Sequence, residues 1–487
     1  MNRVPADRVR VLNHADVRKQ GAYVLYWMIA NRRVNQNFSL QRAVEWSAKL
    51  QRPLIIFEAL RIKYHWASDR LHRFVLQGMA HNRASLNDGL ATYYCYVEPE
   101  VNHGSGLLEE LAQKACVVVS DDFPSFFLPK MLRLVAKRLD VKLEVVDSNG
   151  LYPMHDTERV FPSAHTFRRH LQKELRPHLE QFPQHDPLSA TKIPAPVPIP
   201  KSILKKWPEA SDELLAATPA ALAHLNIDHK VGPAAMQGGS GAAVECLQQF
   251  LENGLCRYGE DRNHPDTDAS SGLSPYLHFG HISSHQIFEA VADQEGWTLA
   301  NLAAKATGSR EGWCGMSNHA ESFLDELITW RELGYNMCSH RDDYDRYESL
   351  PDWAQETLAE HAKDKREILY SLEEFERAKT HDEIWNAAQR QLVTEGRMHN
   401  YLRMLWGKKI LEWSPSPRDA LAVMIELNNK YAVDGRNPNS YSGIFWVLGR
   451  YDRAWGPERP IYGKIRYMTS DSTRRKLKMT EYLKRYA

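Results

Sequence analysis

The first 150 residues alternate between short apolar runs and longer segments in which apolar residues recur every three or four positions. The apolar runs are rich in Val, Ile, Tyr and Phe, as buried strands are. They are AYVLYWMIA (22–30), PLIIFEAL (53–60), TYYCYV (92–97), CVVVSD (116–121) and VKLEVVD (141–147). The segments with helical spacing cover 38–50, 68–90, 107–114 and 124–139. This alternation predicts an α/β domain with a parallel, Rossmann-like sheet. No G-x-G-x-x-G follows the first strand, which argues against a dinucleotide site.

The second half of the chain has a different pattern. Residues 183–208 hold seven prolines, a composition that favours an extended, semi-rigid connector. Beyond about residue 210 the strand pattern ends, helical stretches follow one another, and nine of the thirteen tryptophans occur. We therefore expect an α/β N-terminal domain at 1–180, a long Pro-rich linker at 181–210 and a large all-helical domain at 211–487.

Composition excludes several classes of protein. The chain has no run of 18 apolar residues, which excludes a membrane span, and its polar start is unlike a secretory or transit peptide. Six scattered cysteines without a C-x-x-C pair argue against disulfides and against a zinc site, so no metal is expected. We expect a cytoplasmic protein, nucleoid-associated if it is bacterial.

Charge is balanced overall, with a net value of +1, but not along the chain. From Arg450 to the end there are eleven Lys and Arg against four Asp and Glu. A basic end suits a polyanionic partner, and a solvated C-terminal face explains the same surplus.

Two short motifs have the chemistry of ligand sites. In SSGLSPYLHFGHIS (270–283), Pro275 stands at a predicted first helical position, where free backbone N–H groups can bind phosphate. An ordinary helix N-cap has the same sequence pattern. In FLDELITWREL (323–333), Glu326 and Trp330 share a helix face and Arg331 points to the side, which suits a stackable ligand with polar edges. A surface pair beside a half-buried Trp is the alternative.

Two longer segments are rich in Trp and in side-chain amides. In 383–413, Trp406 and Trp413 lie two helical turns apart and Trp385 belongs to a neighbouring helix. Such a stripe forms either a core or a path for electron hopping, and spacing does not choose. In 426–456, the turns around Asp434-Gly435 and Asn437-Pro438-Asn439 can hydrogen-bond a heteroaromatic ring or merely form turns.

Together these segments resemble the class II cyclobutane-pyrimidine-dimer (CPD) photolyases of the photolyase/cryptochrome family. The resemblance extends from about Gly21 to Tyr486 and is loose in the N-terminal half. Seven motifs occur in the family's order: SSGLSPYLHFG, ELITWREL, LYSLEEFE, WNAAQ to LRMLWGKKILEW, VDGRNPNSY, DRAWG and GKIRYM.

The resemblance implies a helical domain that binds FAD in a U shape. Position 258 and the 270–274 segment would contact the phosphates and ribityl chain, with Arg331 as a phosphate partner. Arg403 and Asp434 would form an ion pair beside the isoalloxazine, and Asn428 would face flavin N5. The implied FAD contacts are Tyr258, Ser270, Ser271, Gly272, Leu273, Ser274, Arg331, Arg403, Asn428, Asp434 and Gly435.

The resemblance also implies light-driven DNA repair, in which excited FADH⁻ donates an electron to the dimer, the cyclobutane ring splits and the electron returns. Glu326 would hydrogen-bond the dimer and stabilise its radical anion. Trp330 and Trp446 would stack on the flipped-out dimer, and Met404 would pack by its 5′ base. Asn428 completes the implied catalytic set.

The remaining implied roles concern electron supply and DNA. Trp406, Trp385 and Trp413 correspond, from proximal to distal, to the photoreduction chain of class II proteins. Arg453 and Arg466 match residues at the DNA surface. The expected partner is double-stranded DNA that contains dimers, without a membrane or an obligate protein partner, and a monomer is expected. An antenna pigment of the deazaflavin or folate type does not follow from the sequence.

This chain departs from the family pattern at two places. Asn437 and Ser440 replace Asp and Gly of the common D-G-R-D-P-N-G-Y, and Ser440 would be strained if that position needs a positive φ. The 449–453 segment is one residue shorter than the common form and lacks its His.

Two alternatives remain open. The first is a cryptochrome-type flavin photoreceptor without repair activity, which would need neither a dimer pocket nor the basic C-terminal segment. The second is a helical nucleic-acid-binding protein without flavin, which the absorption spectrum of the purified protein would distinguish.

Overall fold

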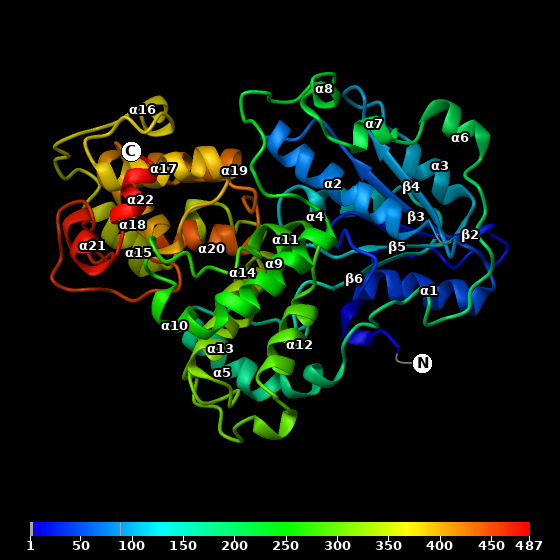
Figure 1. The fold of residues 1–487 in the computed structure, drawn as a ribbon, viewed down its shortest axis with the longest axis horizontal. Helices are drawn as coiled ribbons and strands as arrows, with labels where there is room; N and C mark the ends of the chain where they lie inside the picture. The colour runs from blue at the N-terminus through cyan, green and yellow to red at the C-terminus, as the bar shows by residue number, and fades with distance from the viewer. Residues whose placement is uncertain (1–2, 88) are drawn as a thin grey trace. The chain divides into compact units, whose positions relative to one another are not determined.

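The computed structural model describes residues 3–87 and 89–487. Its six-stranded sheet has the order β1-β6-β5-β2-β3-β4, with helices on both sides (Figure 1). The strands are β1 (Val9–Val11), β2 (Tyr23–Met28), β3 (Leu54–Leu60), β4 (Thr92–Val97), β5 (Ala115–Asp121) and β6 (Leu143–Val146). All neighbours are parallel except β1, which pairs antiparallel with β6. The predicted α/β sheet is confirmed. Strand β1 was not predicted, because three residues, two of them exposed, are too few to give a pattern.

Four helices connect the strands of this sheet: α1 (Phe38–Leu50), α2 (Asp69–Ser85), α3 (Leu107–Gln113) and α4 (Leu128–Ala136). Alternate apolar residues of β2 and of the first half of β3, such as Tyr26 and Ile56, pack with Leu40 and Val44 of α1 in one apolar cluster. Alternate residues of a strand share a face, so one period-2 set of side chains builds this layer of the core.

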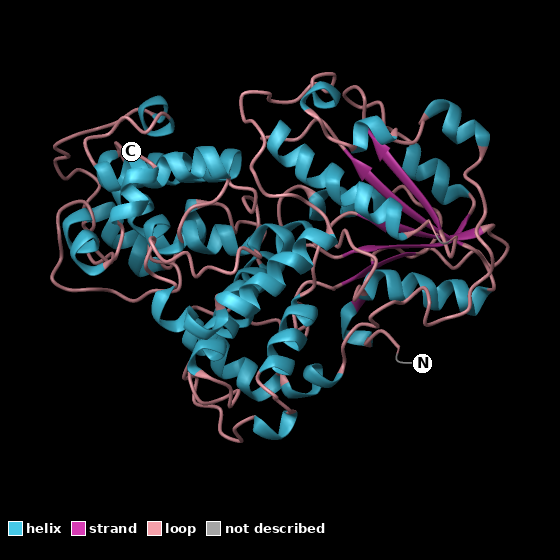
Figure 2. Cartoon of the chain, in the orientation of Figure 1, coloured by secondary structure: helices cyan, strands magenta, loops and turns pink. Residues whose placement is uncertain are grey.

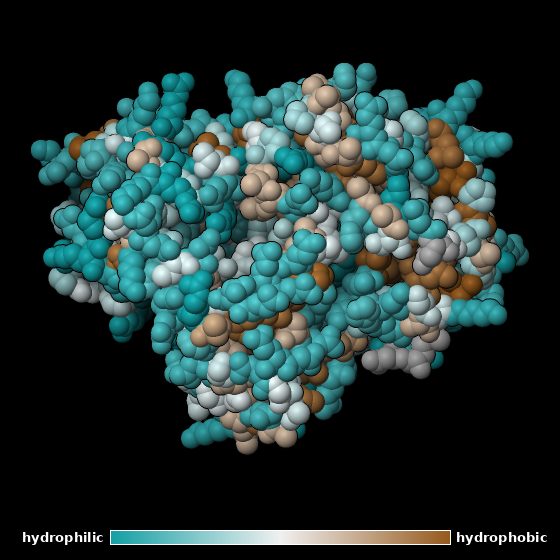
Figure 3. Space-filling view, viewed as in Figure 1, coloured by the Kyte–Doolittle hydropathy of each residue, from teal (hydrophilic) through white to brown (hydrophobic). Residues whose placement is uncertain are grey.

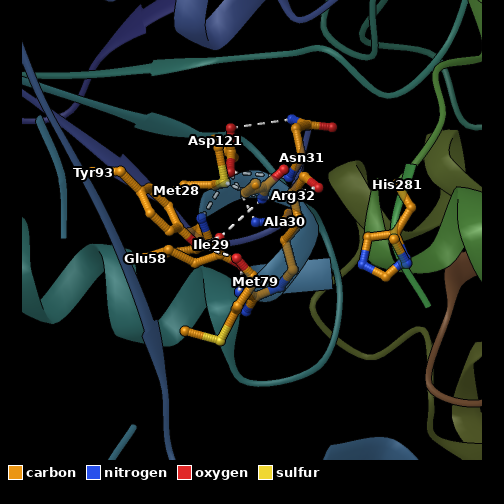
Figure 4. Close-up of polar contacts among 12 residues, drawn as sticks. Met28, Ile29, Ala30, Asn31, Arg32, Glu58, Met79, Tyr93, Asp121 and His281 are labelled. Carbon is orange, nitrogen blue, oxygen red and sulfur yellow. Dashed lines mark hydrogen bonds and ion pairs between the residues drawn. The ribbon is translucent and has the colours of Figure 1, made fainter. Parts of the chain in front are cut away.

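A buried polar network holds the loop after β2 (Figure 4). Asp121 Oδ2, at the end of β5, accepts hydrogen bonds from the backbone N–H groups of Ile29, Ala30 and Asn31 at 2.8, 2.8 and 3.0 Å. Glu58 of β3 has no exposed side-chain surface and pairs with Arg32 of the same loop at 2.7 Å. The Glu58 charge is paired and the Asp121 carboxylate accepts hydrogen bonds, so both buried acids have polar partners.

After β6 the described residues form helices, turns and isolated bridges but no further strand (Figure 2). The helices are α5 (Ala164–Glu174), α6 (Lys201–Lys206), α7 (Asp212–Leu215), α8 (Pro219–Leu222), α9 (Ser240–Asn253), α10 (Tyr258–Asp261), α11 (Ser274–Phe279), α12 (Ser284–Gln294), α13 (Asn318–Leu324), α14 (Arg331–His340), α15 (Asp352–Glu360), α16 (Leu372–Glu376), α17 (Glu383–Glu395), α18 (Asn400–Trp413), α19 (Pro417–Tyr431), α20 (Pro438–Val447), α21 (Ser470–Lys476) and α22 (Thr480–Arg485). Within the described residues, no helix combines the length and apolar character that crossing a bilayer requires.

The chain divides into two compact units, each made of several segments. The first unit comprises 1–157, 175–248 and 273–291, and the second comprises 158–174, 249–272 and 292–487. The Pro-rich 181–210 segment belongs to the first unit, where β4 binds it: Thr92 Oγ1 donates to the Val197 carbonyl and Tyr94 OH to the Trp207 carbonyl, both at 2.6 Å. The division at 180 and 210 therefore stays a prediction.

The two units also differ at the surface. On the face shown in Figure 3, brown apolar patches occur over the sheet and helices of the first unit, whereas the surface over α21 and α22 is largely hydrophilic. The hydrophilic surface coincides with the basic C-terminal segment of the sequence.

Candidate active site

Glu326 lies in a short π-helical segment, η5 (Asp325–Trp330), between α13 and α14. The regular α-helix expected over 323–333 is therefore wrong for these residues. The carboxylate of the neighbouring Asp325, the first residue of η5, binds Arg168 of α5 through two hydrogen bonds of 2.6 and 2.9 Å in a buried ion pair. Single π turns inside helices are frequent at functional sites.

The Glu326 carboxylate is partly buried and faces a cation. Arg262 Nη1 donates to Glu326 Oε1 at 2.7 Å, and the Arg262 guanidinium lies 5.5 Å from the ring centroid of the buried Tyr258. Burial raises the pKa of Glu326, and the Arg262 charge opposes that rise. Burial likewise raises the pKa of Tyr258. The carboxyl group therefore keeps a proton more readily than an exposed glutamate does.

The other side chains predicted to touch a DNA lesion lie on helices that pack against one another. Trp330 ends η5, Met404 lies in α18 and Trp446 lies near the end of α20; all three are partly exposed. The α14 helix, which continues η5, packs on α20, and α20 packs on α18. Arg331 does not point to the surface: it is buried, with its guanidinium 4.5 Å from the Tyr335 ring centroid.

The Ser-rich segment predicted to hold phosphate is half exposed. Ser270 and Gly272 are exposed, Ser271 is partly buried, and Gly272 has a φ of +68°. The boundary of the two units falls between Gly272 and Leu273. In the first unit Leu273 is buried and Ser274 begins α11, so Pro275 is the second residue of the helix, one position later than predicted.

The polar residues predicted to surround a flavin ring lie in α18, in α19 and in the turn before α20. Arg403 and Asp434 form an ion pair at 3.8 Å, both partly buried. Gly435 is buried, and a Cβ there would lie 2.9 Å from the Asn428 carbonyl oxygen, so a larger residue does not fit. The predicted ion pair is thus present, and its place beside a flavin stays a prediction.

Hydrogen bonds fix the orientation of the buried Asn428 amide. Asn429 Oδ1 accepts from the backbone N–H of Arg436 at 2.8 Å, and a backbone N–H can only donate. The Asn428 atom 3.1 Å from that oxygen must therefore be its Nδ2, which also donates to Ser440 Oγ at 2.8 Å. Both N–H donors of Asn428 are used within the chain, and Asn428 Oδ1 is left as an acceptor.

Ser440 is not strained, contrary to the expectation for a position with positive φ. It lies in the first turn of α20 and is absent from the described residues that have φ above zero. Its hydroxyl instead serves as the acceptor that holds Asn428. The substitution therefore adds a contact at this position.

The three tryptophans of 383–413 form a buried row. The rings of Trp385 and Trp406 are 6.4 Å apart and nearly parallel, at 6°, and the rings of Trp385 and Trp413 are 6.0 Å apart. Trp406 Nε1 donates to Gln389 at 2.9 Å, and Trp385 Nε1 donates to the Trp406 carbonyl at 3.0 Å. Trp385 therefore lies between the other two, in the order that the resemblance implies.

The two arginines predicted at a DNA surface lie beside Trp455. Arg466 binds Asp452 through two hydrogen bonds of 2.9 and 3.2 Å, and its guanidinium lies 4.0 Å from the Trp455 ring centroid. Arg453 is exposed, with its guanidinium 4.6 Å from the same ring. In the shortened 449–453 segment, Arg450 is buried, and desolvation lowers its pKa to about 10.

Comparison with known proteins identifies the family. No family model matches the chain. The chain is 34% identical over 484 residues to a protein named deoxyribodipyrimidine photo-lyase from Methanothermobacter thermautotrophicus, and the alignment covers 99% of this chain and 98% of the relative. This chain belongs to the deoxyribodipyrimidine photo-lyase family. Photolyases of the same name from Oryza sativa subsp. japonica and Arabidopsis thaliana are 33% and 32% identical, over 98% and 94% of this chain and 89% and 88% of theirs.

Solved structures confirm the photolyase/cryptochrome fold. A bacterial class III photolyase from Agrobacterium tumefaciens matches with a TM-score of 0.67 at 19% identity, covering 96% of this chain and 86% of that one. A Synechocystis cryptochrome matches with a TM-score of 0.63 at 16% identity, covering 95% and 88%. The resemblance inferred from the seven motifs is confirmed for the photolyase family, and the assignment to class II stays a prediction.

Sequence reasoning missed several residues of this photolyase. Arg262 pairs with Glu326 from 64 positions away, a separation that carries no pattern. Tyr370 and His381 extend the tryptophan row: the Tyr370 ring lies 5.6 Å and the His381 ring 5.0 Å from that of Trp413. Lys408 is fully buried. Tyr370 lies in the LYSLEEFE motif and Lys408 in LRMLWGKKILEW, so the sequence contained a signal for these two residues, whereas Arg262 and His381 lie in none of the seven motifs.

Proposed function

We propose that this photolyase repairs cyclobutane pyrimidine dimers in double-stranded DNA with light, as a class II enzyme. The observation that carries the proposal is the near-full-length similarity to proteins named deoxyribodipyrimidine photo-lyase. The proposed substrate is a dimer swung out of the duplex, where unpairing costs least because the lesion already pairs poorly.

The residues of the second unit fit a flavin. An ion pair between Arg403 and Asp434, a fixed amide acceptor at Asn428 and hydroxyls at 270–271 offer hydrogen bonds to a ring and to phosphates. The proposed FAD, bound in reduced form, supplies the electron that light transfers to the dimer. The protein's part is to bind, to orient and to exclude water.

Asn428 has a defined task in this proposal. Because both of its N–H groups are engaged, the Asn428 side chain has only its acceptor, Oδ1, left for a ligand. An acceptor beside flavin N5 favours the state in which that nitrogen carries a proton. The orientation supports a site that keeps its flavin reduced.

Glu326 and the indoles of Trp330 and Trp446 are proposed to hold the dimer. A carboxyl group whose pKa is raised can donate its proton in a hydrogen bond to a carbonyl that gains negative charge. The Arg262 guanidinium, 2.7 Å from Glu326, adds a positive charge on the same side. Met404 would pack by the 5′ base of the dimer.

DNA would be bound through Arg453, Arg466 and the basic C-terminal segment. Cationic side chains on a hydrophilic surface release counterions from phosphates, which makes binding sensitive to salt. A monomeric, cytoplasmic protein without a protein partner remains our expectation.

The first unit contains a cavity that suits an antenna pigment. Its volume is about 600 Å³, and aromatic and basic side chains line it, among them Trp27, Tyr64, Phe126, Lys63 and Arg138. Cavities of this size hold ligands of the size of drugs and cofactors. The lining supports a flat pigment with an acidic group, such as a deazaflavin or a folate.

The experiment that tests the proposal is repair of a thymine-dimer oligonucleotide by the purified protein under blue light and in darkness. Loss of dimers under light alone supports it. A flavin photoreceptor without repair, the alternative, would bleach and recover without removing dimers, and no observation favours it over repair.

A further inference from the structure

Lys408, in the middle of α18, is a fully buried lysine. Its side chain has an exposed fraction of 0%, although lysine is almost never fully buried unless it is paired. Among the ion pairs of the described residues, none involves Lys408, and the acid that acts on it, Asp452, lies beyond ion-pair distance. Burying an ammonium group without an ion-pair partner is unfavourable to folding, so stability alone does not explain why a lysine stands at this buried position.

The Lys408 ammonium contacts the end of α20. Its Nζ donates to the Val447 carbonyl at 2.6 Å and lies 5.0 Å from the centroid of the Trp446 ring. The two helices meet closely because residue 407 is glycine: a Cβ there would lie 2.5 Å from Val447 Cγ2. The close approach brings the ammonium to the ring that we propose stacks on the dimer.

Trp446 belongs to an alternating series of cations and indoles, the cation–indole row: Lys408, Trp446, Arg466, Trp455 and Arg453. The Arg466 guanidinium lies 5.4 Å from the Trp446 ring centroid and 4.0 Å from that of Trp455. The carboxylate of Asp452 contacts the row: it binds Arg466 and accepts from Trp455 Nε1 at 3.1 Å. Cation–π contacts strengthen where water is excluded, as it is around Lys408.

We propose that Lys408 is a positioning residue of the dimer pocket: its ammonium fixes the Trp446 indole from the buried side and places a positive charge behind it. The inference rests on the proposed function, because Trp446 must stack on the dimer. A fixed charge in a buried site favours the negative charge that develops on the dimer more than the same charge in water would. The role accounts for a buried cation that folding alone would not favour.

The charge of Lys408 changes near neutral pH. Burial lowers the pKa of Lys408 to about 7; Asp452 acts to raise it and Arg466 lowers it further. On its own helix Lys409 is paired with Glu412 at 2.7 Å, and α20 has no Asp, Glu, Lys, Arg or His. Tyr462 OH donates to the Lys408 carbonyl at 2.8 Å, and burial raises the pKa of that phenol. The ammonium is therefore present below about pH 7 and is lost as the pH rises.

The test uses full-length protein with FAD reduced chemically beforehand and a duplex that contains one thymine dimer. Repair yield per absorbed photon and dark binding of the duplex are measured from pH 6 to 8.5. We expect both to fall in the wild type as the pH rises through about 7. In Lys408→Met both should be low and independent of pH, with binding weaker at pH 6 by roughly 2- to 30-fold, the equilibrium effect of one cation–π contact. Lys408→Arg should restore a yield that does not vary with pH.

The controls separate this role from folding and from the proposed function itself. Lys430→Met removes a partly buried lysine that is paired with Glu376 at 2.6 Å in the same unit, and it should keep the wild-type pH profile.

A Lys408→Met protein with the wild-type profile and yield would overturn the inference. If that variant does not fold, Arg466→Gln decides: loss of the Arg466 charge should move the midpoint to higher pH, and an unchanged midpoint overturns the inference. Wild-type protein that repairs nothing at any pH would instead refute the proposed function.

Discussion

At the scale of single residues, the candidate active site depends on side-chain amides whose orientation is fixed by hydrogen bonds to their neighbours. The backbone N–H of Arg436 orients Asn429, and Asn429 together with Ser440 orients Asn428. The sequence predicted that Asn428 faces a flavin but not which end of its amide does so. That choice depends on the fold, which brings residue 440 to residue 428.

Substituting Ser440 should change the flavin's electron affinity. Ser440→Ala removes one of the two bonds that orient Asn428 and leaves the bond to Asn429, so Asn428 Oδ1 is held less firmly as an acceptor. One hydrogen bond contributes about 0.5–1.5 kcal/mol, and a bias of that size lowers a one-electron midpoint potential by roughly 20–65 mV. Spectroelectrochemistry of the purified variant measures the shift. Ser442→Ala, which removes a hydroxyl bonded to a backbone carbonyl of the same helix, is the matched control and should leave the potential unchanged.

Glu326 should matter for repair and not for flavin binding. Glu326→Ala removes the carboxyl group and its contact with Arg262, and we expect repair yield to fall about tenfold or more, as when a preorganised donor is lost. Glu326→Gln keeps a hydrogen-bond donor and should lose less. The flavin absorbance per protein should be unchanged in both variants; loss of flavin would instead make Glu326 a structural residue.

At the scale of elements, long periodic segments could be predicted and local exceptions could not. Five strands and the absence of strands after residue 210 followed from the period of the apolar residues. The π turn at η5 did not, because the apolar spacing of 323–333 is that of a regular helix. The close packing of α18 on α20 at Gly407 likewise depends on a tertiary contact.

Breaking the ion pair that anchors η5 should destabilise the second unit. Arg168→Met leaves the buried Asp325 carboxylate without its partner, which costs about 3–5 kcal/mol of unfolding free energy. Equilibrium urea unfolding measures the change. Arg377→Met, which removes an exposed pair with Glu373, should cost at most about 1 kcal/mol. Equal costs in the two variants would contradict the role given to the buried pair.

The tryptophan row should carry electrons to an oxidised flavin without being needed for repair. Trp385→Phe interrupts the row at its middle member, so photoreduction of oxidised FAD should be largely lost. Repair by protein reduced chemically beforehand should be retained. Absorption changes under blue light with an added reductant measure the first, and the dimer assay the second. Undiminished photoreduction would make the row part of the core only.

At the scale of the whole molecule, the sequence predicted the family because its motifs are spread over the helical half in a fixed order, and relatives that match nearly the full chain bear this out. The domain boundaries were harder to predict, because each unit is made of several separate segments. Between residues 158 and 291 the chain passes from one unit to the other more than once. The cavity of the first unit had no sequence signal, since residues from separate strands and loops line it.

Filling that cavity should remove an antenna contribution and nothing else. Ala59 lines the cavity, and Ala59→Trp would occupy it. We expect the variant to lose any absorption that flavin does not account for, while repair under light absorbed by the flavin persists. The comparison is the action spectrum of repair for the two proteins. Identical spectra would mean that the cavity holds no pigment.

The most direct test of the account is the number of dimers removed per absorbed photon by the purified, reduced protein on a thymine-dimer duplex, with a matched sample kept dark. We predict dimer loss that grows with light dose and is absent in darkness. Dimers that persist under light, in protein whose spectrum shows bound reduced flavin, would contradict it.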